Sequence, residues 1–153
     1  MFENIAAHKR KGNEVFKLPL HTPIGVINLT GRIAGEANPL YYNEVLKTAG
    51  TTAKQAKRTG TITASQIQEA RDRDIELFPK FVLTGWSYID EQGSEQIGPP
   101  DSNGTFVAFT PEACSGLLKA LDNEVVDFVR QEFASTVNFS NATSMDAEAL
   151  GKN

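Results

Sequence analysis

The sequence has little of the two residue types that build disulfide scaffolds and zinc modules. Its 153 residues include one cysteine, Cys114, and two histidines, His8 and His21. One cysteine forms no intramolecular disulfide, and two distant histidines do not complete a Cys/His zinc cluster. We therefore expect a protein that is held together by its apolar core and that uses neither a metal nor another cofactor.

Long apolar runs and a leader segment are also missing. No run approaches the roughly 18 apolar residues that a membrane-spanning helix needs. The early basic cluster of Lys9, Arg10 and Lys11 is not followed by an apolar segment of the kind that a signal peptide carries. These absences predict a cytoplasmic protein without a membrane partner.

Motifs of common enzymes are absent, namely GxGxxG, a Walker-type loop, GxSxG, HExxH and an EF-hand loop. Asp72 and Asp74 form an acidic pair, but they lie in the alternating run 71–76, which is typical of a solvated helix face. Cys114 has no histidine or second cysteine close in sequence, so we expect a buried apolar residue rather than a nucleophile. The sequence predicts a protein that is not an enzyme.

Charge is divided unevenly along the chain, although the net charge is only −4. Residues 1–60 carry nine basic and four acidic residues, whereas residues 61–153 carry six basic and fifteen acidic residues. Such a division can orient a protein against a charged partner or, head to tail, against copies of itself, and we expect self-association. Because the basic residues are spread out and no nucleic-acid-binding signature accompanies them, we do not expect nucleic-acid binding.

The first third of the chain predicts a β-hairpin and a helix. Residues 15–32 form two apolar and β-branched runs around a turn signal at 22–25. Asn38 and Pro39 then mark a helix start, because asparagine caps an orphan amide and proline at the first helical position gives up an amide that has no partner. This helix is expected to cover residues 40–49, before a basic loop.

The longest predicted helix begins at a capping box, in which Thr63 and Gln66 can satisfy each other's backbone amides. Its apolar stripe continues to Val82 with a period close to 3.6 residues. Pro79 interrupts the stripe and is expected to kink or restart the helix, since proline removes one backbone hydrogen bond. Residues 85–86, a glycine and a tryptophan, are expected to end it.

The last third predicts a loop, a short strand and two more helices. Residues 90–105 are rich in glycine and proline and read as a surface loop, and residues 106–109 as a short strand. Residues 110–111 combine a threonine cap with a proline, and Asp122 or Asn123 caps the final helix. Five residues of the final helix form a broad apolar stripe: Val125, Val126, Phe128, Val129 and Phe133.

Together these elements predict an α+β fold that is mainly helical, with a small N-terminal β-hairpin followed by about four helices. The globular domain is expected to cover residues 15–139. Residues 1–14 are expected to be an extended arm and residues 140–153 a flexible tail, because both have few apolar residues.

Several aromatic and basic residues are candidates for partner binding. Trp86 and Tyr88 follow the longest helix and form either a partner-binding patch or part of the core. Of the adjacent Tyr41 and Tyr42, one ring should face inward and the other be exposed. The complete set of candidates is Tyr41, Tyr42, Trp86, Tyr88, Lys54, Lys57 and Arg58.

Short segments follow one another in a recognisable order. They are LTGR at 29–32, NPLY at 38–41, ARD at 70–72, FVLTGWS at 81–87, IDEQG at 89–93, FVAFTPE at 106–112 and VNF at 137–139. In this order they resemble the tail assembly chaperones and related small morphogenesis proteins of tailed bacteriophages.

This resemblance implies a non-enzymatic protein of the infected host's cytoplasm, which binds the long tape-measure protein, shields its apolar helices and recruits tail-tube subunits. An alternative is a stoichiometric virion component, such as a minor capsid, cement or head–tail connector protein. Neighbouring capsid or portal subunits would then order its arm and tail.

Overall fold

The computed structural model describes residues 14–48 and 63–139. Most of the predicted arm, the predicted tail and the basic loop with Lys54, Lys57 and Arg58 lie outside these ranges. The proposed domain boundaries and the roles of these three basic residues therefore stay predictions.

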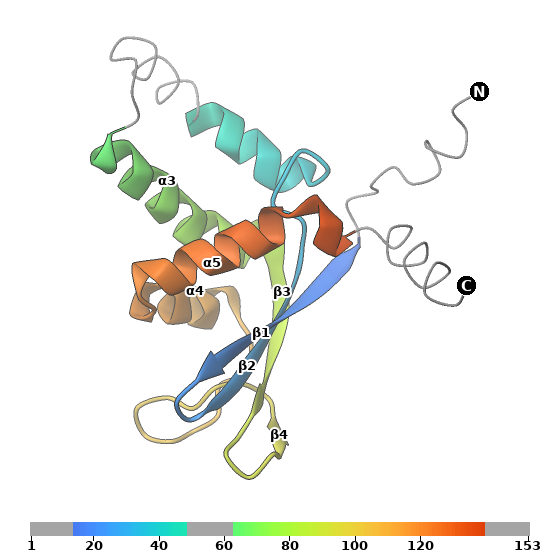
Figure 1. The fold of residues 1–153 in the computed structure, drawn as a ribbon, viewed down its shortest axis with the longest axis vertical. Helices are drawn as coiled ribbons and strands as arrows, with labels where there is room; N and C mark the ends of the chain where they lie inside the picture. The colour runs from blue at the N-terminus through green and yellow to red at the C-terminus, as the bar shows by residue number, and fades with distance from the viewer. Residues whose placement is uncertain (1–13, 49–62, 140–153) are drawn as a thin grey trace, which may run out of the picture.

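The predicted N-terminal hairpin is present and forms half of an antiparallel sheet. Strand β1 (Val15–Thr22) pairs with β2 (Gly25–Arg32) over their whole length. Thr22 closes the turn, because its Oγ1 donates a hydrogen bond to the carbonyl oxygen of Gly25 at 2.7 Å. The sheet continues through β3 (Leu83–Ile89) to β4 (Glu95–Gln96), in the order β1-β2-β3-β4 (Figure 1).

Strand β3 corrects the prediction that residues 85–86 end a helix. Helix α3 (Ala64–Leu77) gives way to a π-helical turn, η1 (Phe78–Val82), which has Pro79 near its start. The chain then enters β3, whose aromatic and β-branched residues suit a strand. The apolar stripe of the helix is followed without a gap by the apolar residues of the strand. The change from a helical to a strand period is therefore not visible in the sequence.

The predicted strand at 106–109 is also wrong. In this segment the only strand-like pairing is an isolated bridge between Phe106 and Pro100. Pro99 and Pro100 have no amide to donate, which prevents a ladder from extending there. The short β4 instead lies within the stretch predicted to be a loop.

Three predicted helix starts are confirmed by their caps. The chain is helical from residue 39 to residue 48, and Asn38 Oδ1 accepts a hydrogen bond from the Tyr41 amide at 3.4 Å. At the start of α3, Thr63 and Gln66 form the complete capping box. Thr110 Oγ1 caps helix α4 (Pro111–Ala120) by accepting from the amide of Ala113.

The core lies between the sheet and the helices, which gather around one end of the sheet (Figure 1). Helix α5 (Asn123–Ala134) crosses β1, and the 3₁₀ turn η2 (Thr136–Phe139) follows it. An aromatic cluster closes this end, formed by Phe16, Tyr41, Phe78, Phe133 and Phe139. The described residues thus form an α+β fold with a sheet and four α-helices, as predicted.

No helix within residues 14–48 and 63–139 has the length and apolar character that crossing a membrane requires.

Candidate partner-binding groove

A groove of about 620 Å³ lies where the end of the β1–β2 hairpin faces the junction of α4 and α5. One wall is the hairpin end, and the other is the first two turns of α5. We call it the hairpin groove, and it is lined by Pro19, Leu20, His21, Thr22, Pro23, Ala120, Leu121, Asp122, Glu124, Val125 and Phe128.

Local sequence fixes both walls of the hairpin groove. Pro19 is tolerated in β1 because this strand is at the edge of the sheet, where a missing amide costs little. Leu121 and Asp122 have extended backbones between α4 and α5, which turns the chain sharply without a longer loop. Two prolines therefore lie on one wall of the groove and a tight helix junction on the other.

Phe128 belongs to the broad apolar stripe predicted for the final helix, but it lies on the open side of the groove and not in the core. Its side chain is 44% exposed, whereas Val126, Val129 and Phe133 are 2% exposed or less. These three residues are spaced three and four apart, so they occupy the helix face that meets the sheet. Val125 and Phe128 are displaced around the helix toward the groove.

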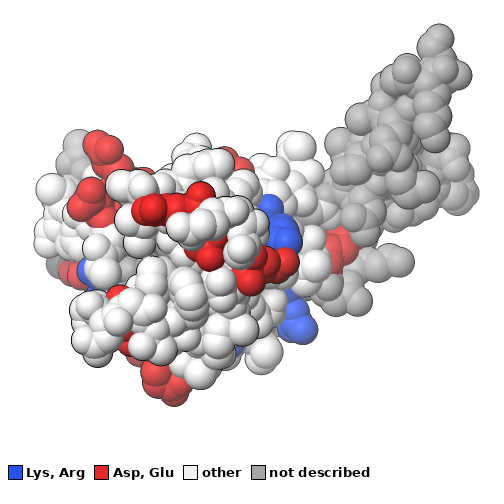
Figure 2. Space-filling view, turned by 90° about the horizontal axis from the view of Figure 1, so that it is seen from below, with Lys and Arg blue, Asp and Glu red and all other residues white. Residues whose placement is uncertain are grey.

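The rim of the hairpin groove is acidic. Asp122 and Glu124 line it at the start of α5, where the helix dipole favours negative charge, and no lysine or arginine is among the lining residues. The described residues as a whole carry sixteen acidic and eight basic residues. Figure 2 views the molecule from the end that carries the β1–β2 turn and β4, and most of the charged surface on that face is acidic.

The structure buries two of the aromatic residues predicted to bind a partner. Tyr41 is 6% exposed, and its hydroxyl donates a 2.8 Å hydrogen bond to Asp74 Oδ1. Tyr88 is 2% exposed, and its hydroxyl donates to the carbonyl oxygen of Ile24 at 2.7 Å. Burial is the main cause that raises the pKa of both phenols. Both rings therefore support the fold in this structure.

Trp86 and Tyr42 are half-buried. The indole Nε1 of Trp86 donates a hydrogen bond to the carbonyl oxygen of Val107 at 3.0 Å. The Trp86 ring packs edge to face against the ring of Phe109, with 5.2 Å between the ring centroids. Neither residue lines the hairpin groove. A partner-binding role for them stays a prediction.

Sequence reasoning missed the residues of the hairpin groove. The available signal was the breadth of the stripe in the last helix, since Phe128 widens it beyond what one face can bury. Nothing in the sequence paired this helix with the distant prolines of the hairpin, because that contact is tertiary.

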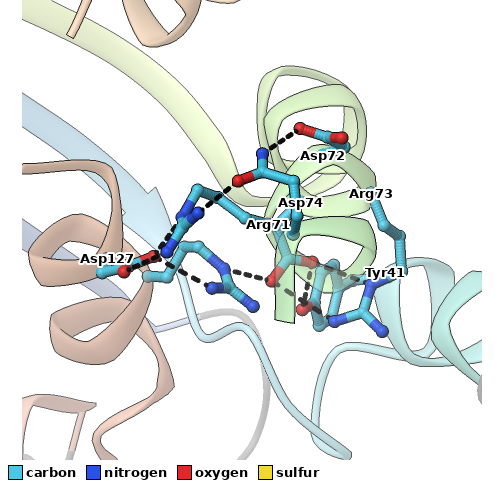
Figure 3. A network of polar contacts seen from close by, with 8 residues as sticks. Tyr41, Arg71, Asp72, Arg73, Asp74 and Asp127 are labelled. Carbon is cyan, nitrogen blue, oxygen red and sulfur yellow. Dashed lines mark hydrogen bonds and ion pairs between the residues drawn. The ribbon is translucent and has the colours of Figure 1, made fainter. Parts of the chain in front are cut away.

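A polar network between α3 and α5 corrects part of the prediction that residues 71–76 form a solvated face, since Asp72 and Glu76 are exposed but Asp74 is buried. Asp74 is 4% exposed and accepts hydrogen bonds from Tyr41, Arg73 and Arg130. The guanidinium of Arg71 donates two hydrogen bonds, of 2.9 and 2.8 Å, to the carboxylate of Asp127 in α5 (Figure 3). The missed factor is helix α5, which packs across this face of α3.

This network joins α5 to α3 and so holds in place the groove wall that α5 forms. The hydrogen bonds from Arg71 hold the pKa of the Asp127 carboxyl below its usual range. Asp127 is therefore held in its charged form by its arginine partners and is not poised to exchange a proton near neutral pH.

Other reactive groups of the described chain offer little chemistry. The thiol of Cys114 is fully buried, as predicted, and burial raises its pKa to about 12. No group of three or more histidine, cysteine, aspartate or glutamate residues within 14–48 and 63–139 is arranged to hold a metal ion. What the groove offers is an apolar surface with an acidic rim, which suits binding.

Comparison with known proteins gives one match. The model of the family described as YdaY prophage protein matches residues 36–152, which is more than half of the chain. This range begins after the hairpin and includes the α5 wall of the groove. No curated protein and no solved structure matches the chain.

Proposed function

Because the chain belongs to the YdaY prophage protein family, and so derives from a bacteriophage, we propose that it is a non-enzymatic protein of phage assembly that works as a tail assembly chaperone. In this proposal it binds apolar helices of the tape-measure protein in the host cytoplasm and presents them to tail-tube subunits. The observation that carries the proposal is the hairpin groove with its exposed Phe128.

The shape and lining of the groove suit one face of a helix. A helix binds such a groove through apolar side chains that are spaced three and four residues apart. Phe128 and Val125 of α5 and the exposed Pro19 on the hairpin side supply apolar surface for them. Each large apolar side chain that becomes fully buried contributes about 1.5–3 kcal/mol.

A groove of this size predicts weak and reversible binding at each site. Two or three buried side chains must offset the loss of translational and rotational freedom on association. A long tape-measure protein could bind many copies, and their release as the tail tube forms would then be easy. Weak sites in many copies suit a chaperone better than a permanent contact.

The direct test is binding of the purified chain to a helical fragment of the tape-measure protein encoded by the same prophage. Phe128→Ser should raise the dissociation constant about tenfold, which corresponds to a loss of about 1.4 kcal/mol of binding free energy. Val137→Ser is the matched control, because Val137 is 66% exposed and lies outside the groove. Equal affinities for the Phe128 variant and the control would contradict this use of the groove.

Mass spectrometry of particles purified after prophage induction separates the chaperone from the alternative role. A chaperone should be present in the lysate and missing from mature particles. The same protein at high copy number in the particles would favour a stoichiometric virion component, such as a minor capsid, cement or connector protein.

A further inference from the structure

The hairpin groove has an acidic rim and an apolar floor, and one segment of this chain has the complementary composition. Residues 1–13 contain Phe2 and Ile5, followed by the basic cluster 9–11. Phe2, Ile5 and Lys9 are spaced three and four residues apart, as the anchors of a helix in a groove are.

We propose that residues 1–13 of a second copy of the chain occupy the hairpin groove. Phe2 and Ile5 bind against Val125 and Phe128, and the basic cluster faces the acidic rim. The proposal rests on the proposed function insofar as both use the same groove, and it adds a regulatory step. Self-association protects the apolar groove until a tape-measure helix displaces the segment.

Charge complementarity supports this occupant. Asp122 and Glu124 lie at the groove with no lysine or arginine among the lining residues, and neither makes an ion pair with another described residue. Residues 1–13 carry three basic residues and one acidic residue, Glu3. The attraction between exposed charges adds specificity and a faster encounter more than affinity.

The position of the segment favours a second copy over the same chain. Residues 1–13 join β1 at Val15, whereas the groove is at the other end of the strand, near Thr22. Seven residues of strand span about 23 Å. The ten residues that separate Ile5 from Val15 span at most about 33 Å, so most of their reach would be used to bring the segment to its own groove, whereas the segment of a second copy is free of this constraint.

This geometry gives a head-to-tail contact, since each copy offers a segment at one end of β1 and a groove at the other. Such a heterologous contact does not close after two copies unless the rotation between them happens to be 180°. We therefore expect dimers and longer species whose size increases with concentration.

A charge swap tests the proposal on the full-length chain. The groove variant carries Asp122→Lys and Glu124→Lys, and the segment variant carries Lys9→Glu, Arg10→Glu and Lys11→Glu. Alone, each variant brings like charges together, so sedimentation velocity should show self-association at least tenfold weaker than that of the natural chain. Mixed in equal amounts, the two variants should associate again, because each now supplies a matching partner.

The concentration dependence of the natural chain distinguishes the two geometries, because a contact within one chain would leave the natural chain monomeric at every concentration. A chain with Glu69→Lys and Glu95→Lys is the matched control, since both residues are exposed and lie outside the groove. It should associate like the natural chain. An increase in salt to about 0.5 M should weaken association of the natural chain, because the paired charges are exposed.

Three results would overturn the proposal. The first is a natural chain that stays monomeric up to about 100 µM. The second is a groove variant or a segment variant that, alone, associates like the control. The third is a mixture of the two variants that does not associate. None of these measurements contains tape-measure protein, so the two proposals can fail separately. If the charge swap succeeds and a tape-measure fragment neither binds nor dissociates the self-associated species, only the chaperone proposal fails.

Discussion

Arg130 of α5 donates a hydrogen bond of 2.8 Å from its Nε to Oδ2 of Asp74 in α3, and Asp74 is only 4% exposed. The same carboxylate accepts from Tyr41 of the preceding helix, so one buried charge joins three helices. A buried carboxylate is stable only when its partners satisfy it, and here two arginines and a phenol do so.

Replacing Asp74 with alanine should lower the free energy of unfolding by about 3 kcal/mol, because the change removes the only carboxylate paired with Arg73 among the described residues and one of the two paired with Arg130. Asp72→Ala is the matched control, since Asp72 is exposed and should change stability by about 0.5 kcal/mol or less. Urea denaturation of both variants measures the difference. Similar midpoints for the two variants would mean that the network does not hold the helices.

Two glycine-to-alanine changes should affect stability in opposite directions. A Cβ at Gly31 would lie 2.7 Å from the carbonyl oxygen of Val82 and 2.9 Å from the ring of Phe133, so we expect a loss of about 2 kcal/mol. A Cβ at Gly116, inside α4, would meet nothing within 4 Å, and alanine there should add about 0.5–1 kcal/mol. Thermal denaturation distinguishes the two, and a stable Gly31→Ala variant would contradict the close approach of η1 to β2.

Stability should decrease as the pH rises above about 9, and Cys114 should account for part of the change. Burial raises the pKa of this thiol from 9.0 to about 12 in the folded chain. Its contribution is therefore complete below pH 9 and is lost as the pH rises from 9 toward 12, by up to about 1.4 kcal/mol per pH unit.

Chemical denaturation between pH 9 and pH 10 tests this contribution, because an unperturbed thiol titrates at a lower pH than an unperturbed phenol, whose pKa is about 10. Cys114→Ala should lower stability at neutral pH and yet show a shallower decline than the natural chain. Parallel declines for the two proteins would show that the thiol is not the group that titrates.

Trp86 is expected to act mainly in folding. Trp86→Ala removes the edge-to-face contact with Phe109 and the hydrogen bond to Val107, and should cost about 3 kcal/mol. Trp86→Phe keeps a ring beside Phe109 and should cost only about 1 kcal/mol for the lost hydrogen bond. If Trp86→Ala instead weakens partner binding at unchanged thermal stability, the ring belongs to an interface.

Local signals predicted the elements whose ends are fixed by neighbouring residues. The hairpin turn, the cap at Asn38, the capping box at Thr63 and Gln66 and the start at Thr110 are each set by a few adjacent side chains, and all four are present. Strand β3 was missed because its apolar residues continue the stripe of α3, and only pairing with β2 marks it as a strand.

By itself, the sequence determined the α+β class, the helix starts, the burial of Cys114 and the uneven distribution of charge, because these depend on composition and on residues close together in the chain. Only the tertiary structure decided which side chains meet. It buried Asp74 and Tyr41 between helices that are far apart in sequence, and it left Phe128 exposed opposite the hairpin. The packing of α5 across both α3 and β1 is the physical reason, since it decides which residues of each helix lose contact with water.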